Sequence, residues 1–396
     1  MERRNFLKSS VFASGVVLIP SFLKGMQFMT PDKLSGYRNV IVIQLSGGND
    51  GLNTIVPYQD DVYLKNRPNI GLNTDLFKLS DELYLNAHCR ELKELYDNGE
   101  MTIINSVGYP NPNRSHFRST DIWHTGSASD QFLKNGWLGM YLDANCESSF
   151  QGIQFDLELS LILKGKNLNG ISVTDPKQLF NTTREPFFKN IAEQLDDEML
   201  TEDNQGYLYK TLVDTYSSAE YIYDHFKTYE TQSEFPNNQF GKSLKGIAQL
   251  ISSGLKTRVY YTTLGGFDTH VNQLNTHNTL MRTYSEGIAA LTKELKKSDR
   301  FKDTLILTFS EFGRRVKENG SKGTDHGAAN NLFVIGGSLK KPGLFNGKPD
   351  LENLDNNGDI RYEVDFRNVY ATVLENWLQA DSRHVLGKGF EKLSFV

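Results

Sequence analysis

The stretch TLILTFSEFGRRVKENGSKGTDHGAANNLFVIGG, residues Thr304 to Gly337, combines two short apolar runs with polar side chains of the kind that bind metals. The runs are Leu305–Phe309 and Leu332–Ile335, and each is short and apolar enough to be a buried strand of a parallel sheet. The polar side chains beside them are Glu311, Asp325 and His326. Because groups at the ends of parallel strands collect at one edge of an open α/β sheet, the stretch predicts an α/β fold with a divalent-metal site at that edge.

The totals bound the class of protein. A chain of 396 residues can hold one large α/β domain or two modest ones, and 38% hydrophobic residues with 33 glycines predict a globular chain with a sizeable core and many turns. The net charge of −5 argues against a nucleic-acid surface or a basic membrane-binding face, so neither is expected. Cys89 and Cys146 are the only cysteines, too few for a disulfide scaffold or a cysteine metal site, although they could pair in an oxidising compartment.

The N-terminus, MERRNFLKSSVFASGVVLIPSFLKG, has the pattern of an export signal. Arg3 and Arg4 precede a weakly apolar segment, Val11 to Leu23, and paired arginines favour the twin-arginine route over an ordinary signal peptide or an amphipathic helix. We therefore expect residues 1–28 to engage the twin-arginine export machinery and the mature protein to be periplasmic or extracellular. No A-x-A cleavage site follows, so the segment could stay as an anchor. No other run approaches the roughly 20 apolar residues that span a bilayer.

Two further apolar strands are each followed by candidate metal ligands. Val40–Leu45 runs into SGGNDG, where Asp50 is either a ligand at the sheet edge or a turn residue beside glycine. Arg258–Leu264 runs into GGFDTH, where Asp268 and His270 are candidate ligands, the alternative being a capping aspartate and an unrelated histidine. A long amphipathic helix follows, and its His277 is either a further ligand or a solvated residue.

Another strand, Met101–Val107, is followed by a loop and a helix that begins near Ser115. We expect Phe117, Ile122 and Trp123 to face inward from this helix. Ser115 is either a simple N-cap or a hydroxyl placed in the field of the helix N-terminus, where an anion is stabilised. Arg114 and Arg118 flank it with forked donors suited to phosphate or sulfate.

The remaining regions carry little chemistry. Residues from about 145 to 240 read as a helical insertion or cap that shapes substrate access. The DNNGD segment, Asp355–Asp359, reads as a turn, because its glycine is misplaced for a calcium loop. Phe366–Ala380 predicts an amphipathic helix that closes the chain.

Taken in order, six motifs resemble a known family. They are RRNFLK, LSGGNDGLN, SHFRSTDIW, GGFDTH, TFSEFGRR and TDHG. The series of strand-end ligands resembles the alkaline phosphatase/sulfatase superfamily, and the motifs look like domain-of-unknown-function family 1501 within it. The resemblance covers residues 37–396 and implies a central, mostly parallel sheet flanked by helices on both faces. It also implies a hydrolase of phosphate or sulfate esters with a hydroxyl nucleophile at a helix N-terminus.

The resemblance also implies roles for individual residues. One metal would be held by Asp268, His270 and His326. A second would face Asp50, Glu311 and the Ser115 hydroxyl. Arg118 or Arg114 would steady the substrate's equatorial oxygens. Carboxylate and imidazole ligands suit Zn²⁺, with Mn²⁺, Mg²⁺ or Ca²⁺ as alternatives, and one or two ions are expected.

The chain departs from the superfamily at the second metal. Glu311-Phe312 stands where Asp-His is usual, so that site lacks an imidazole, and Arg314 could replace its cation. The short spacing between Asp268 and His270 leaves open whether His270 or His277 is the ligand. Two functions follow: a hydrolase of a small anionic ester, or a non-catalytic relative that binds sulfated or phosphorylated glycans or an envelope partner.

Overall fold

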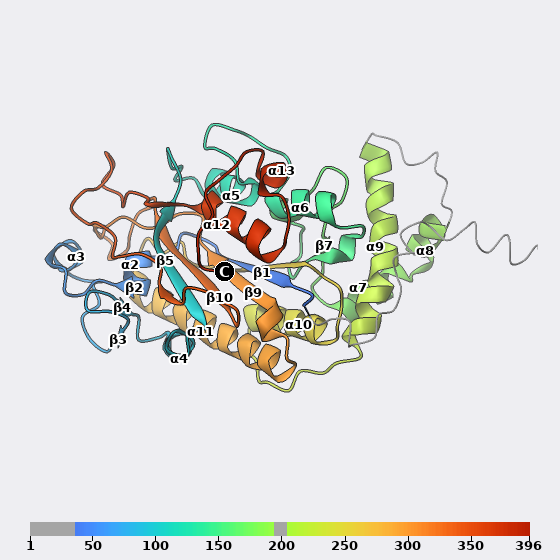
Figure 1. The fold of residues 1–396 in the computed structure, drawn as a ribbon, viewed down its shortest axis with the longest axis horizontal. Helices are drawn as coiled ribbons and strands as arrows, with labels where there is room; N and C mark the ends of the chain where they lie inside the picture. Colours follow the sequence, from blue (N-terminus) through green and yellow to red (C-terminus); the bar gives the residue numbers. More distant parts are fainter. Residues whose placement is uncertain (1–35, 194–203) are drawn as a thin grey trace, which may run out of the picture.

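The computed structural model describes residues 36–193 and 204–396, and within them nine strands form one sheet through the middle of the molecule (Figure 1). The strands are β1 Asn39–Leu45, β5 Met101–Gly108, β6 Gly152–Gln154, β7 Ile171–Ser172, β8 Val259–Leu264, β9 Thr304–Phe309, β10 Asn330–Gly336, β11 Gly343–Leu344 and β12 Val364–Asp365. Their order is β11-β5-β10-β9-β1-β8-β6-β7, and β12 also pairs with β5. The predicted export signal, residues 1–28, lies outside the described residues.

One strand runs against the others. β10 is antiparallel to both of its neighbours, β5 and β9, whereas the other pairs of the sheet are parallel. The prediction that Leu332–Ile335 is a parallel strand is therefore wrong. Residues 310–329 join β9 to β10 at a single edge of the sheet and contain no crossover helix, and a parallel pair would have required one. As a result His326, before β10, lies at the same edge as Glu311, after β9.

Both faces of the sheet are buried, which explains why its strands read as continuous apolar runs. On β1, Val40 and Val42 pack into one core, while Ile41, Ile43 and Leu45 pack into the other. The first core is covered by α5 His116–Thr125, α6 Trp137–Asn145, α12 Phe366–Thr372 and α13 Ser382–Leu386. The second is covered by α4 Arg90–Asp97, α10 Gln239–Ser252 and α11 Gln273–Lys297. The expected α/β architecture, a mostly parallel sheet between helices, is confirmed.

The smaller elements lie at the two ends of the sheet (Figure 1). At one end are α2 Gly51–Thr54, α3 Asp61–Asn66 and a three-stranded sheet of β2 Ile55–Val56, β3 Phe77–Lys78 and β4 Tyr84–Leu85. At the other are α7 Pro176–Thr183, α8 Pro186–Glu193 and α9 Asn204–Phe226. Short 3₁₀ turns cover Ser149–Gln151, Leu161–Leu163 and Phe301–Asp303. The predicted insertion thus supplies β6 and β7 to the sheet as well as helices, and its role as a cap stays a prediction.

Two expectations about helices are wrong in detail. Phe117 was expected to face inward with Ile122 and Trp123, but its side chain is 87% exposed while theirs are buried. Phe117 precedes Ile122 by five residues, which places it about 140° around the helix from that residue. The closing helix is also not uniform, because α12 passes into a π-helical turn at Val373–Trp377.

Cys89 and Cys146 are both free thiols. In the part of the chain that the structure describes, no helix combines the length and the apolar character needed to cross a membrane.

Candidate metal centre

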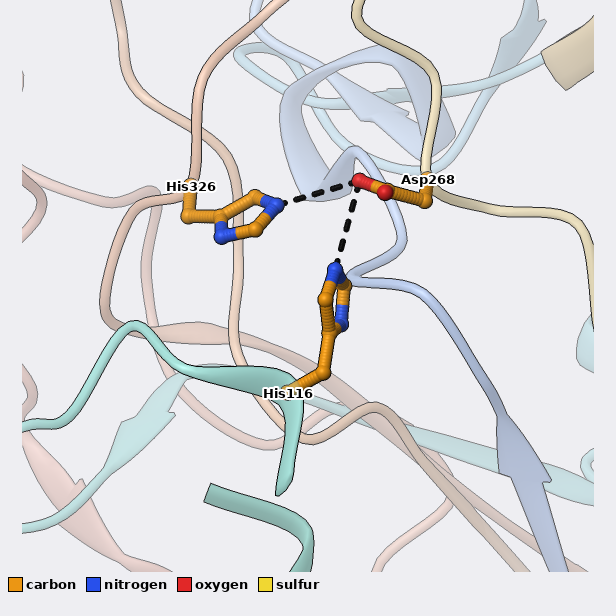
Figure 2. Close-up of side chains that lie close together, drawn as sticks. All are labelled: His116, Asp268 and His326. Carbon is orange, nitrogen blue, oxygen red and sulfur yellow. Dashed lines mark hydrogen bonds and ion pairs between the residues drawn. The ribbon is translucent and has the colours of Figure 1, made fainter. Parts of the chain in front are cut away.

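Three segments meet at the carboxyl edge of the sheet and bring together His116, Asp268 and His326, called here the His/Asp cluster (Figure 2). His116 is in the first turn of α5, after β5; Asp268 follows β8; and His326 precedes β10. One ligand atom from each lies within 4.8 Å of the others. Oδ1 of Asp268 is 3.0 Å from Nε2 of His326 and 3.4 Å from Nε2 of His116.

Both imidazoles of the cluster are held from behind. Nδ1 of His116 lies 3.0 Å from Oε1 of Glu311, and Nδ1 of His326 lies 2.8 Å from the Arg114 carbonyl oxygen. A metal-binding histidine typically gives its second ring nitrogen to a carboxylate or carbonyl in this way, which fixes the tautomer and the ring orientation. Both Nε2 atoms are thereby directed at the Asp268 carboxylate.

A further imidazole approaches the same carboxylate. Nε2 of His270 is 2.9 Å from Oδ1 of Asp268 and 3.0 Å from Nε2 of His326. Nδ1 of His270 faces the Asp325 carboxylate at 3.6 Å. Tetrahedral ligands about 2.0–2.1 Å from a zinc ion are about 3.3 Å apart, so these separations suit a shared ion.

The residues present fit a divalent metal. Nε2 of His116 is buried, faces Oδ1 of Asp268 at 3.4 Å, and has no hydrogen-bond partner among the described residues. Imidazole nitrogens combined with a carboxylate oxygen are a donor set for Zn²⁺ or Mn²⁺. An ion beside Nε2 would give this nitrogen the close partner that it lacks.

Arg314 supplies a fixed positive charge beside the cluster. Its buried guanidinium donates to Oδ1 of Asp268 at 2.8 Å and to the backbone carbonyls of Gly47, Gly48, Phe267 and Thr324. Burial would raise the pKa of the Asp268 carboxyl, but Arg314 and His326 hold it well below its usual range. Asp268 is therefore ionised and able to bind a cation.

The glycines of SGGNDG allow this close packing. A Cβ atom on Gly47, whose φ is +115°, would lie 2.4 Å from the Asp268 amide nitrogen, and one on Gly48 would overlap the Phe312 ring. The glycines of this loop therefore allow close contact with Asp268 and Phe312, whereas the sequence suggested close contact with a ligand.

The imidazoles respond oppositely to their surroundings. The hydrogen bond with Glu311 raises the pKa of His116, whereas burial lowers the pKa of His326. A metal ligand must be a neutral imidazole, and the lowered pKa of His326 favours that form.

Asp50 and Glu311, expected at a second ion, are engaged by protein groups. Asp50 is buried, caps α2, forms an ion pair with Arg67 at 2.7 Å and accepts from Gln273. Burial would raise the pKa of Asp50, but Arg67 lowers it. Glu311 accepts from the Gly47 amide as well as contacting His116.

The two arginines expected to hold an anion are engaged as well. The Arg114 guanidinium pairs with Asp359, and Arg118 donates to the carbonyls of Ser129 and Gln131. Ser115 is exposed at the N-cap of α5, and its side chain makes no capping hydrogen bond.

The other two candidates, Asp325 and His277, are not members of the His/Asp cluster. Asp325 is exposed and accepts from Asn319, which lowers its pKa. His277 is fully buried, with Nε2 3.0 Å from Oδ1 of Asn49, and burial lowers its pKa to about 4. Of the two histidines left open by the sequence, His270 is therefore the one beside Asp268.

Sequence reasoning missed His116 and Arg67. A signal for His116 was present, because it stands one residue after Ser115 in the segment that follows β5. No local pattern marks Arg67, whose partner is 17 residues away in the chain.

A sequence model of the family described as "Protein of unknown function (DUF1501)" matches residues 105–388. The chain belongs to this family. The resemblance seen in the motifs is thereby confirmed. No curated protein sequence matches this DUF1501 member.

Several solved structures are similar to this DUF1501 protein at low identity. For a phosphonate monoester hydrolase from Silicibacter pomeroyi, the similarity covers 90% of this chain and 78% of that one, with 8% identity and a TM-score of 0.42. For the PsFucS1 sulfatase from Pseudoalteromonas sp., the similarity covers 93% of this chain and 70% of that one, with 13% identity and a TM-score of 0.37. For a protein in the alkaline phosphatase superfamily from Vibrio parahaemolyticus, the similarity covers 78% of this chain and 62% of that one, with 10% identity and a TM-score of 0.35.

Proposed function

We propose that this chain is an extracytoplasmic, metal-dependent hydrolase of phosphate or sulfate esters. The observation that carries the proposal is the convergence of the Nε2 atoms of His116 and His326 on the Asp268 carboxylate while both Nδ1 atoms are held. Asp268, His116 and His326 would hold one divalent ion, for which Zn²⁺ is the first choice. His270, beside Asp268 and His326, is a further candidate donor. Mn²⁺, Mg²⁺ and Ca²⁺ are the alternatives.

A bound ion would supply Lewis-acid polarisation and lower the pKa of a hydroxyl or water nearby. The remaining roles fall to the chain's own residues. Ser115 is the proposed nucleophile, because its exposed hydroxyl makes no capping bond and stands at the N-terminus of α5, where negative charge is stabilised. Arg314 keeps Asp268 ionised, and Glu311 orients His116.

We propose one ion and not two. The carboxylate of Asp50 is occupied by Arg67 and Gln273, and the carboxylate of Glu311 by His116 and the Gly47 amide. The guanidinium of Arg67 thus provides positive charge beside Asp50, where the second ion was expected.

A second candidate is a non-catalytic relative that binds a sulfated or phosphorylated glycan or an envelope partner. It is favoured by the engagement of Arg114 with Asp359 and of Arg118 with backbone carbonyls, which leaves the expected anion-binding groups committed. It is also favoured by Phe312, which packs against His116 at a ring distance of 4.9 Å where a second-site imidazole was expected.

Metal content and turnover distinguish these functions. We expect one Zn²⁺ per exported chain by elemental analysis and chelator-sensitive hydrolysis of aryl phosphates or aryl sulfates. Ser115→Ala should abolish hydrolysis and keep the metal, whereas Ser394→Ala, at an exposed serine near the C-terminus, should change neither. If the metal-replete protein is inert on both ester classes, the hydrolase proposal is wrong. Binding on a sulfated-glycan array without turnover would then support the second candidate.

The proposed location rests on the N-terminal motif alone. Replacing Arg3 and Arg4 by lysine should retain the protein in the cytoplasm if the twin-arginine machinery exports it. Unchanged export of that double variant would contradict this route.

A further inference from the structure

A cavity of about 580 Å³ lies where three loops meet near the His/Asp cluster. Its walls come from the loop after β5, the residues just before β10, and the loop before β12. Its volume is within the roughly 300–1,000 Å³ range of small-molecule sites. Nothing in the proposed hydrolysis uses this space.

Arg114 connects the cavity to the cluster. Its backbone carbonyl accepts from Nδ1 of His326, and its Nε donates at 2.7 Å to Oδ2 of Asp359, a fully buried residue of the wall loop. Ala328, which lines the cavity, follows His326 by two residues. The cavity and the cluster are therefore built on the same segments.

The DNNGD loop forms a self-supported wall. Oδ1 of Asp355 accepts from the backbone amides of Asn357 at 2.8 Å and Asp359 at 2.9 Å, and Gly358 has a φ of +80°. These internal bonds confirm the predicted turn. They hold Asn356 and Asn357 at the cavity with exposed side chains.

The lining has the chemistry of a site for a neutral, polyhydroxylated ring. Asn111 and Asn356 offer amide donors and acceptors, and the charged side chains are one acid, Asp355, and one base, Arg361. This balance favours a neutral polar ligand over a second anion. Tyr362 is 38% exposed at the wall and offers an aromatic face of the kind that packs against the C–H face of a sugar ring.

We propose that this cavity is a saccharide subsite, which binds a neutral sugar ring of the molecule whose anionic group is bound at the His/Asp cluster. The link to an ester substrate rests on the proposed function. Binding of an uncharged saccharide does not, because the residues of the cavity are distinct from those of the cluster.

The test uses the full, zinc-loaded chain and uncharged probes: the methyl glycosides of glucose, galactose, mannose and N-acetylglucosamine, with sorbitol as the open-chain comparison. Saturation-transfer NMR and titration should detect binding of at least one glycoside and weaker binding of sorbitol. Tyr362→Ala and Asn356→Ala should each weaken that Kd by about tenfold, the equivalent of 1.4 kcal/mol.

Two controls separate the failure of the subsite from the failure of the hydrolase. Phe187→Ala removes an exposed aromatic on α8, outside the cavity, and should leave the Kd unchanged. Asp268→Asn should lose the metal and keep glycoside binding. The subsite is overturned if none of the glycosides binds, if sorbitol binds as well as they do, or if the cavity variants bind like the wild type. Glycoside binding that depends on Tyr362, in a protein inert toward every ester, would retain the subsite and reject the hydrolase.

Discussion

Oε1 of Glu311 lies 3.0 Å from Nδ1 of His116, so a buried carboxylate stands behind an imidazole of the His/Asp cluster. The sequence suggested Glu311 as a direct ligand of a second ion. Its contact with His116 supports an indirect role, in which the carboxylate orients the ring and raises its basicity. This contact gives the Glu311 carboxylate a partner within the chain.

Replacing Glu311 by glutamine should weaken Zn²⁺ binding by about 10- to 100-fold and leave the stoichiometry at one ion, because the ring keeps its place and loses its charged partner. Competition with a chromophoric chelator measures the affinity. Glu286→Gln, at an exposed glutamate of α11, is the matched control and should bind Zn²⁺ like the wild type. Unchanged affinity in Glu311→Gln would refute the supporting role.

Substitutions of Asp50, after β1, and of Asp268, after β8, should have different effects on stability and on metal binding. Asp50→Asn breaks a buried ion pair with Arg67 and should lower the free energy of unfolding by about 3–5 kcal/mol while one ion is retained. Asp268→Asn should lose the ion at a smaller cost, because this side chain is 48% exposed. Urea unfolding of the metal-free variants and elemental analysis give both quantities. Metal loss in Asp50→Asn that is still folded would instead favour its role as a ligand.

Much of the fold could be predicted because the spacing of apolar residues and glycines along the chain marks the strands and the helix ends. β1, β8 and β9 are apolar on both faces, and Gly126, with a φ of +71°, ends α5. Strand direction has no such local signature, since an apolar run is compatible with either direction. The antiparallel course of β10 therefore escaped prediction, although it is what brings His326 to the cluster.

The candidate site could be predicted only in part for a related reason. Asp268, His270 and His326 follow or precede recognisable strands, and the structure brings them together. The engagement of Asp50 by Arg67 depends on tertiary packing against the segment after α3, which no spacing in the sequence reveals. His116 was not predicted because the neighbouring Ser115, a hydroxyl at a helix start, is the more usual functional group at such a position.

The two cysteines should behave as thiols throughout. Ellman's reagent in denaturant without reductant should detect both Cys89 and Cys146, because neither is in a disulfide. In the native protein the reaction should be slow, because burial raises the pKa of Cys146 to about 12 and that of Cys89 further still. Detection of thiols only after reduction would show that the exported protein forms a bridge.

Two buried histidines away from the cluster should make the protein sensitive to acid. Burial lowers the pKa of His124 to about 3 and that of His277 to about 4, compared with about 6.5 for an unfolded chain. Between these values the unfolded state takes up protons that the folded state does not. The free energy of unfolding is therefore highest above about pH 6.5, where both histidines are neutral in either state. It decreases as the pH falls from 6.5 toward the folded-state pKa values, about 4 for His277 and about 3 for His124. At pH 5 each residue should lower the free energy of unfolding by about 2 kcal/mol.

Urea unfolding at pH 7 and pH 5, with a chelator present so that metal release does not contribute, measures this loss. His124 places Nε2 2.9 Å from Oε1 of Gln44, and His277 places Nε2 3.0 Å from Oδ1 of Asn49. Glutamine at either position keeps a donor near that atom and cannot be protonated. His124→Gln and His277→Gln should therefore each reduce the difference between the two pH values by about 2 kcal/mol. His384→Gln, at an exposed histidine of α13, should leave it unchanged. If both buried-site variants lose as much free energy of unfolding between pH 7 and pH 5 as the wild type does, carboxylates and not these imidazoles control the acid response.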